Sequence, residues 1–82
     1  MYIHLGGDKL IQTKDLIAIF DLSIETSSKQ TKDYLYHAKQ SKKTDRIGSE
    51  ESKSIVITTD KIYYSPVSSS TLKKRAYQFL SD

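Results

Sequence analysis

The chain has 82 residues, no cysteine and a formal net charge of +3 at neutral pH. This length allows one domain, and the lack of cysteine excludes a disulfide framework and a thiolate metal site. Residues 1–5 lack the features of a signal peptide and the longest apolar run, residues 16–20, is too short to span a bilayer, so we expect a cytoplasmic protein without membrane contact.

A short β-hairpin is predicted at the start of the chain, with strands at residues 2–5 and 10–12. The turn between them contains Gly6 and Gly7, and glycine adopts positive φ without steric cost. These glycines lack the further glycines and the lysine of a phosphate-binding loop, so we interpret them as turn residues.

The third predicted strand covers residues 16–22. Its even-numbered residues, Leu16 to Leu22, share one apolar face, and Ile17 and Ile19 form a second apolar face. A strand that is apolar on both faces is typical of one covered on two sides. Because so small a domain has little interior of its own, the second cover is expected to come from another subunit.

A polar segment, residues 23–28, leads into a predicted surface helix over residues 29–42. Three hydroxyl residues are candidates for its N-cap: Thr26, Ser27 and Ser28. The helix has one narrow docking stripe around Leu35 and Ala38. Residues 43–52 show no periodicity and are predicted to form a mobile loop.

A second hairpin and a helix are predicted in the last third of the chain. Strands at residues 55–58 and 62–65 end at Pro66, which cannot donate to a ladder. The hydroxyl residues 68–71 precede a helix over residues 71–80 whose apolar face is Leu72, Ala76, Phe79 and Leu80. The sum is a single α+β domain of about five short strands and two helices.

No convergent catalytic or metal site is evident. His4 and His37 share no ligand spacing with each other or with an acid, and the adjacent Glu50 and Glu51 are interpreted as solvated loop residues. We therefore expect no enzyme activity, no metal and no cofactor.

Positive charge is concentrated in residues 29–53 and 60–82, whereas acidic residues predominate in residues 1–25. Segregated positive charge indicates an anionic partner such as DNA, and the alternative is a solvated surface that only maintains solubility. The candidate contacts are Lys39, Lys42, Lys43 and Arg46 after the first helix, and Lys73, Lys74 and Arg75 in the second. Cations near a helix start oppose the macrodipole, so Lys73 and Lys74 indicate an anion nearby.

Tyr63 and Tyr64 are adjacent in a strand, so their rings point to opposite sides of the sheet. Packing in the core or between subunits is the favoured interpretation, and stacking on bases is the alternative. Together with Ile17 and Ile19, these tyrosines are the predicted oligomer interface.

Three segments carry a resemblance to a known family: Met-Tyr-Ile-His-Leu-Gly at residues 1–6, Ile-Ala-Ile-Phe-Asp at residues 17–21, and residues 54–76. They resemble the RemA/RemB family of extracellular matrix regulators from Gram-positive spore-forming bacteria, and its RemB branch most. The resemblance implies a ring-like homo-oligomer that regulates transcription of biofilm matrix genes by binding double-stranded DNA around the outside of the ring. A ring would also multiply a weak basic patch.

One departure from the family pattern affects the expected DNA contacts. The resemblance aligns Glu50 and Glu51 with an arginine pair that contacts DNA in the RemA branch. Carboxylates repel phosphate, so Lys42, Lys43, Arg46 and Lys53 would supply the contacts instead. Two alternatives remain open: an interaction module, assembled perhaps with a RemA-like paralogue, that acts through protein contacts alone, and an anion sensor that uses residues 68–71 with Lys73 and Lys74.

Overall fold

The computed structural model describes the backbone of residues 1–26 and 28–80, and the side chains of residues 1–24 and 28–77. The predicted cap at Ser27 and the predicted core side chains of Phe79 and Leu80 lie outside this part of the chain.

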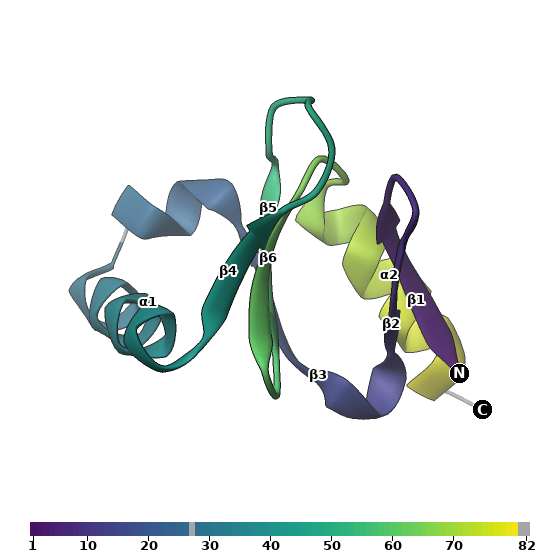
Figure 1. Cartoon of the computed structure of the whole chain (residues 1–82), viewed down its shortest axis with the longest axis horizontal. Helices are drawn as coiled ribbons and strands as arrows, with labels where there is room; N and C mark the ends of the chain where they lie inside the picture. Colours follow the sequence, from purple (N-terminus) through teal and green to yellow (C-terminus); the bar gives the residue numbers. More distant parts are fainter. Residues whose placement is uncertain (27, 81–82) are drawn as a thin grey trace.

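The fold is α+β, with two α-helices and six strands in two sheets. A four-stranded sheet of order β3-β5-β6-β4 stands in the middle, with α1 on one side and with α2 and the two-stranded sheet β1-β2 on the other (Figure 1). The strands are β1 (Tyr2–Gly6), β2 (Lys9–Gln12), β3 (Leu16–Asp21), β4 (Lys43–Arg46), β5 (Ser54–Thr58) and β6 (Lys61–Ser65), and the helices are α1 (Lys29–Ser41) and α2 (Ser69–Leu80).

The predicted N-terminal hairpin is confirmed, with β1 and β2 antiparallel. Gly6 and Gly7 both have positive φ, 113° and 53°. A Cβ atom on Gly6 would lie 3.2 Å from Cγ of Pro66. Gly6 therefore provides both the turn conformation and the close approach of β1 to the segment that leads into α2.

The central strand β5 is buried along its whole length and divides the core into two clusters. Ile55 and Ile57 pack with Leu35 and Ala38 of α1, whereas Val56 packs with side chains from β1, β2 and α2. A strand that is buried on both faces has to be apolar on both, and Ile55, Val56 and Ile57 meet this requirement. The cover of β5 is supplied by this chain's own helices and hairpin, whereas β3, for which a second cover from another subunit is predicted, has only half-buried or exposed residues.

A β-bulge interrupts the pairing of β3 with β5. Leu16 lies opposite Thr58 and Ala18 opposite Ile57, so Ile17 is an extra residue on β3. The bulge changes the predicted alternation, because Leu16 packs with the same cluster as Ile19 and away from the cluster of Ala18. Ile17 is left 50% exposed.

The predicted loop over residues 43–52 is wrong at its start, because residues 43–46 form β4. This strand pairs in parallel with β6, and Arg46 lies opposite Tyr64. All four residues of β4 are exposed. The strand is therefore held at the sheet edge by its backbone hydrogen bonds to β6. Its sequence has no apolar alternation from which a strand could be predicted.

The predicted polar segment 23–28 is also partly regular, since Leu22–Thr26 form a 3₁₀ helix. Ser28 is the N-cap of α1, and its hydroxyl accepts a hydrogen bond from the backbone N–H of Thr31 at 3.4 Å. One of the three predicted cap residues is thus confirmed in that role.

The second helix begins at Ser69, two residues earlier than predicted. Ser68 precedes it, and its hydroxyl accepts from the backbone N–H of Thr71 at 3.3 Å. Lys73 and Lys74 therefore lie beyond the first turn, where the macrodipole acts on them only weakly. The position of these two lysines in the helix therefore gives little indication of an anion beside them.

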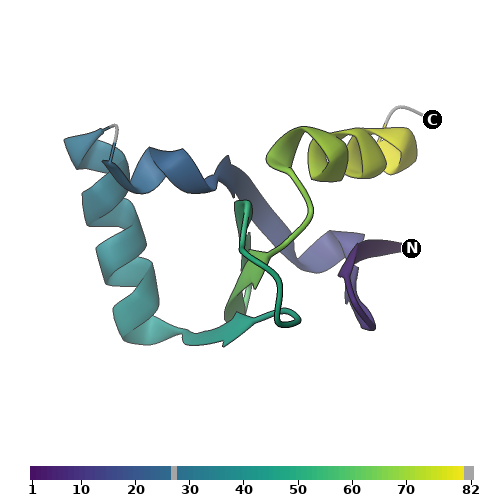
Figure 2. The same ribbon diagram turned by 90° about the horizontal axis from the view of Figure 1, so that it is seen from above.

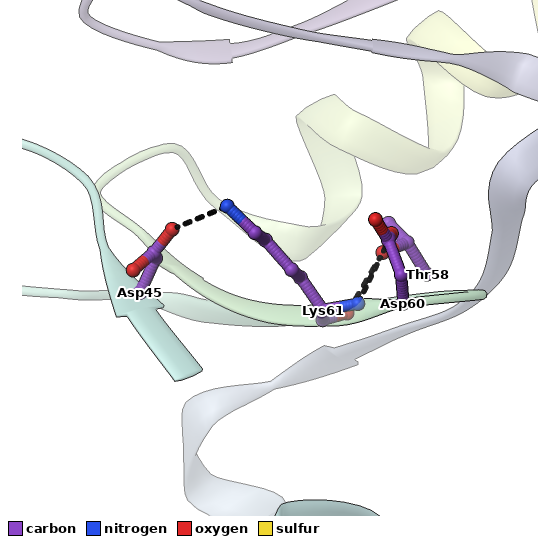
Figure 3. A network of polar contacts seen from close by, with 4 residues as sticks. All are labelled: Asp45, Thr58, Asp60 and Lys61. Atoms are coloured by element: carbon purple, nitrogen blue, oxygen red, sulfur yellow. Dashed lines mark hydrogen bonds and ion pairs between the residues drawn. The ribbon is translucent and has the colours of Figure 1, made fainter. Parts of the chain in front are cut away.

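The turn between β5 and β6 is closed by the Thr58 hydroxyl, which accepts from the backbone N–H of Lys61 at 3.0 Å. The ammonium of Lys61 reaches across to β4 and pairs with Asp45 at 3.3 Å (Figure 3). This hydrogen bond and the nearby charge of Asp45 raise the pKa of Lys61. Lys61 thus joins the edge strand to the hairpin.

Candidate nucleic-acid interface

Three of the predicted DNA contacts lie on the last turn of α1 and on the edge strand β4 that follows it, where Lys43 and Arg46 alternate to opposite faces. Lys39 lies in the last turn of α1, with its ammonium 5.2 Å from the centroid of the Tyr64 ring. Arg46 lies beside Tyr64 in the β4–β6 ladder, and Lys43 begins β4. All three side chains are exposed, and we refer to Lys39, Lys43 and Arg46 as the α1–β4 surface.

Lys43 is the most available cation of this surface. It makes no ion pair or side-chain hydrogen bond with any residue that the structure describes. Its ladder partner on β6 is another cation, Lys61, which is turned to Asp45. The carboxylate of Asp45 compensates the charge of Lys61, so the charge of Lys43 is the one that stays available to a partner.

Lys42 has a structural partner. It is the C-cap of α1, and its ammonium donates a hydrogen bond to the backbone carbonyl of Thr58 at 2.8 Å. The side chain is half-buried. Its charge holds the end of α1 against the end of β5, so Lys42 presents less of its charge to a partner than Lys43 does.

Arg75 is likewise engaged inside the chain. Its guanidinium donates to the backbone carbonyl of His4 at 2.7 Å, which ties α2 to β1. The ring of His4 in turn lies 2.6 Å from the carbonyl oxygen of Gly7. Neither residue shows an arrangement suited to catalysis.

Lys73 and Lys74 are exposed on α2, on the other side of the central sheet from α1 (Figure 2). The backbone N–H and the hydroxyl of Ser23 donate to the Asp21 carboxylate at 2.9 and 2.8 Å and lower its pKa, and the charge of Lys73 makes a smaller contribution in the same direction. Lys53 is exposed just before β5. One chain therefore does not bring the two predicted basic groups onto a common surface.

The loop that carries Glu50 and Glu51 is attached to the α1–β4 surface. Both carboxylates are exposed, and Arg46 donates to the backbone carbonyl of Glu50 at 3.2 Å. Ile47 is buried at the base of this loop. Negative charge therefore borders the α1–β4 surface on its β4 side.

The remaining exposed lysines on α1 were missed by the sequence reasoning. Lys29 and Lys32 begin the helix, and both are exposed. With Tyr36 and Lys39 they recur at spacings of three and four residues, which places them on one side of a helix. The sequence contains this spacing, but the prediction for this helix considered only its apolar stripe around Leu35 and Ala38.

The four predicted oligomer contacts differ in their availability. Tyr63 is only 5% exposed and packs in the core between the sheet, the hairpin and α2. Ile19 and Tyr64 are half-buried against the two core clusters. Ile17, at the bulge, is the one of the four whose side chain is largely exposed.

These features define a small α+β domain with a basic surface laid across a helix and a sheet edge. Residues 2–76 match the family model described as RemA-like, extracellular matrix regulatory protein A-like. The chain is also 48% identical over 80 residues to the extracellular matrix regulatory protein B of Bacillus subtilis (strain 168). The matched region covers 98% of this chain and 94% of the relative.

The chain therefore belongs to the RemA-like family of extracellular matrix regulatory proteins, as the sequence resemblance indicated. Within the described residues, neither helix has the length and apolar character needed to cross a membrane.

Proposed function

We propose that this protein is a cytoplasmic, non-enzymatic regulator of extracellular matrix genes that binds double-stranded DNA as a ring-like homo-oligomer. The observation that carries the proposal is the α1–β4 surface, where Lys39, Lys43 and Arg46 are exposed on regular elements. The Bacillus subtilis relative is named as an extracellular matrix regulatory protein, which supports the regulatory part of the proposal.

The mode of binding follows from the chemistry of this surface. Lysine and arginine side chains on a helix end and a sheet edge neutralise backbone phosphates, and they give little base readout. Lys53 is exposed just before β5 and completes the predicted contacts. Lys73 and Lys74 lie on the other side of the central sheet from α1, so in a ring they would add contacts only through neighbouring subunits. Repetition around an assembly raises the effective concentration of each weak site.

The test is a binding titration of the full chain with a fluorescent duplex over a series of salt concentrations. The wild type is expected to bind with a steep, linear dependence of log affinity on log salt. The variant Lys43→Glu/Arg46→Glu is expected to lose at least about tenfold in affinity, because two phosphate contacts become repulsions. The control Lys9→Glu/Lys14→Glu makes the same change in net charge in the N-terminal hairpin region and should bind almost as the wild type does.

Retention of full affinity by Lys43→Glu/Arg46→Glu would contradict the assignment of this surface. It would favour the second candidate, a protein-interaction module that assembles with itself or with a RemA-like paralogue and influences transcription without touching DNA. The specific observation in favour of that candidate is the exposed pair Glu50 and Glu51, next to Arg46.

A further inference from the structure

One side of α1 carries every lysine of that helix. The helix contains three lysines, Lys29, Lys32 and Lys39, and Tyr36 lies on the same side. At 100° per residue these four positions fall within an arc of about 80°. All four side chains are exposed, and we refer to them as the α1 lysine stripe. Lys32, Tyr36 and Lys39 also line a shallow depression floored by Leu35.

The helix itself does not explain the start of this stripe. Lys29 is the first residue of α1, where the macrodipole is positive, and the first turn contains no acidic residue. Lys32 lies at the end of this turn, where the macrodipole acts more weakly. Neither lysine has an ion pair or a side-chain hydrogen bond with a residue whose side chain the structure describes. Cations in this place cost helix stability, and an anion bound along the stripe would convert that cost into a gain.

The stripe continues the α1–β4 surface in the direction away from the acidic loop. Lys39 belongs to both, and Lys43 follows two residues after the end of α1. From Lys29 to Lys39 the helix rises about 15 Å, which spans several phosphates of a duplex. Tyr36 adds a hydroxyl donor between the cations, and tyrosine hydroxyls commonly contact phosphate.

The composition of α1 selects between anionic partners. A helix that lies on a lipid surface exposes a broad apolar face to the acyl chains. In α1 the two buried apolar residues, Leu35 and Ala38, are turned into the sheet and are unavailable. The stripe offers cations and one aromatic hydroxyl, which match a line of phosphates better than a bilayer.

We infer that the α1 lysine stripe is a second part of the DNA interface, in which Lys29, Lys32 and Tyr36 follow the phosphate backbone of a duplex away from Glu50 and Glu51. This inference rests on the proposed function. It assigns DNA contacts to the start of α1, where neither the sequence reasoning nor the family resemblance placed any.

The experiment compares two double variants of the full chain that lower the charge equally. Lys29→Gln/Lys32→Gln removes two cations of the stripe and leaves the α1–β4 surface intact. Lys9→Gln/Lys14→Gln removes two cations from the hairpin region. Glutamine and lysine have similar helix propensities, so the first variant should remain folded. Affinity for a fluorescent duplex is measured over a salt series, together with the melting temperature.

The stripe variant is expected to bind more weakly, with a log–log salt slope that is shallower by about 1.8 per bound chain. Its melting temperature without DNA is expected to equal or exceed that of the wild type, because the cations oppose the helix dipole. The control variant should keep the slope of the wild type. If Lys29 and Lys32 only supported the fold, the stripe variant would instead have a lower melting temperature than the wild type.

Equal slopes for the stripe variant and the wild type would overturn the inference and leave the proposed function standing. Absence of duplex binding by the wild type at any salt concentration would overturn both. Vesicles of phosphatidylglycerol serve as a second probe: wild-type binding to vesicles that the stripe variant loses, without loss of duplex binding, would also overturn the inference.

Discussion

At the scale of single residues, the basic side chains separate into two kinds by what their terminal nitrogen atoms contact. Lys42 and Arg75 donate to backbone carbonyl groups, of Thr58 and His4, and so connect secondary structure elements. Lys43 is exposed and free of described partners. Identical residue types thus divide between holding the fold and presenting charge.

Substitution of Lys42 by methionine should separate these two kinds. Loss of the hydrogen bond to the Thr58 carbonyl is expected to lower the free energy of unfolding by about 1–2 kcal/mol, since a charged donor is removed from a carbonyl of a buried residue. The salt slope of duplex binding should hardly change. Lys43→Met, the neighbouring control, should show the reverse pattern in urea denaturation and in binding titrations. Equal effects of the two substitutions on stability would contradict this division.

At the scale of elements, sequence patterns identified those parts that depend on local chemistry or on apolar alternation. The N-terminal hairpin, the hairpin of β5 and β6, both helices and the cap at Ser28 follow from glycines, alternating apolar residues and hydroxyl caps. The strand β4 did not follow, because Lys-Thr-Asp-Arg has no apolar face and is a strand only through its ladder with β6. The bulge at Ile17 shifts which side chains of β3 share a face, and the sequence of apolar residues does not reveal this shift.

The candidate site was predictable to a similar extent. The exposure of Lys43 and Arg46 follows from their charge and from the clustering of cations along the chain, and their contact with DNA stays a prediction. The structural partners of Lys42 and Arg75 lie 16 and 71 residues away in sequence, so only the folded chain reveals them.

Gly6 and Gly48 allow the cost of an unfavourable backbone conformation to be separated from the cost of a steric clash. Gly6 and Gly48 both have positive φ, but a Cβ atom would meet the Pro66 ring at Gly6 and nothing within 4 Å at Gly48. We expect Gly48→Ala to cost about 1 kcal/mol through backbone strain alone. Gly6→Ala should cost clearly more, because Pro66 must also move. Chemical denaturation of the two variants measures both values, and a smaller loss for Gly6→Ala would contradict the close approach.

At the scale of the whole molecule, the central sheet has two outer strands, β3 and β4, and they differ in character. The strand β4 is charged and exposed, which discourages pairing with other chains. The strand β3 carries Ile17, half-exposed at the bulge. The two ends of the sheet thus offer unlike surfaces, and unlike surfaces that meet head to tail form a ring where the rotation between subunits closes.

Ile17→Asp should therefore weaken assembly. Multi-angle light scattering of the wild type at micromolar concentration is expected to give a mass several times that of one chain, and the variant a lower mass with an unchanged circular dichroism spectrum. A buried charge at a subunit contact is strongly unfavourable, whereas the control Gln40→Asp on α1 should leave the mass unchanged. A wild type that is monomeric under these conditions would contradict the proposed ring.

The parallel pairing of β4 with β6 has a consequence for how the chain is made. On the ribosome, residues 43–46 emerge before their ladder partners 61–64, and we expect those partners to pair first with the adjacent strand β5, which requires the shorter loop. The strand that bears Lys43 and Arg46 is thus expected to be among the last to dock and, because all four of its residues are exposed, among the first to open. Amide exchange should be faster along β4 than along β5, and a ligand that spans α1 and β4 would slow it.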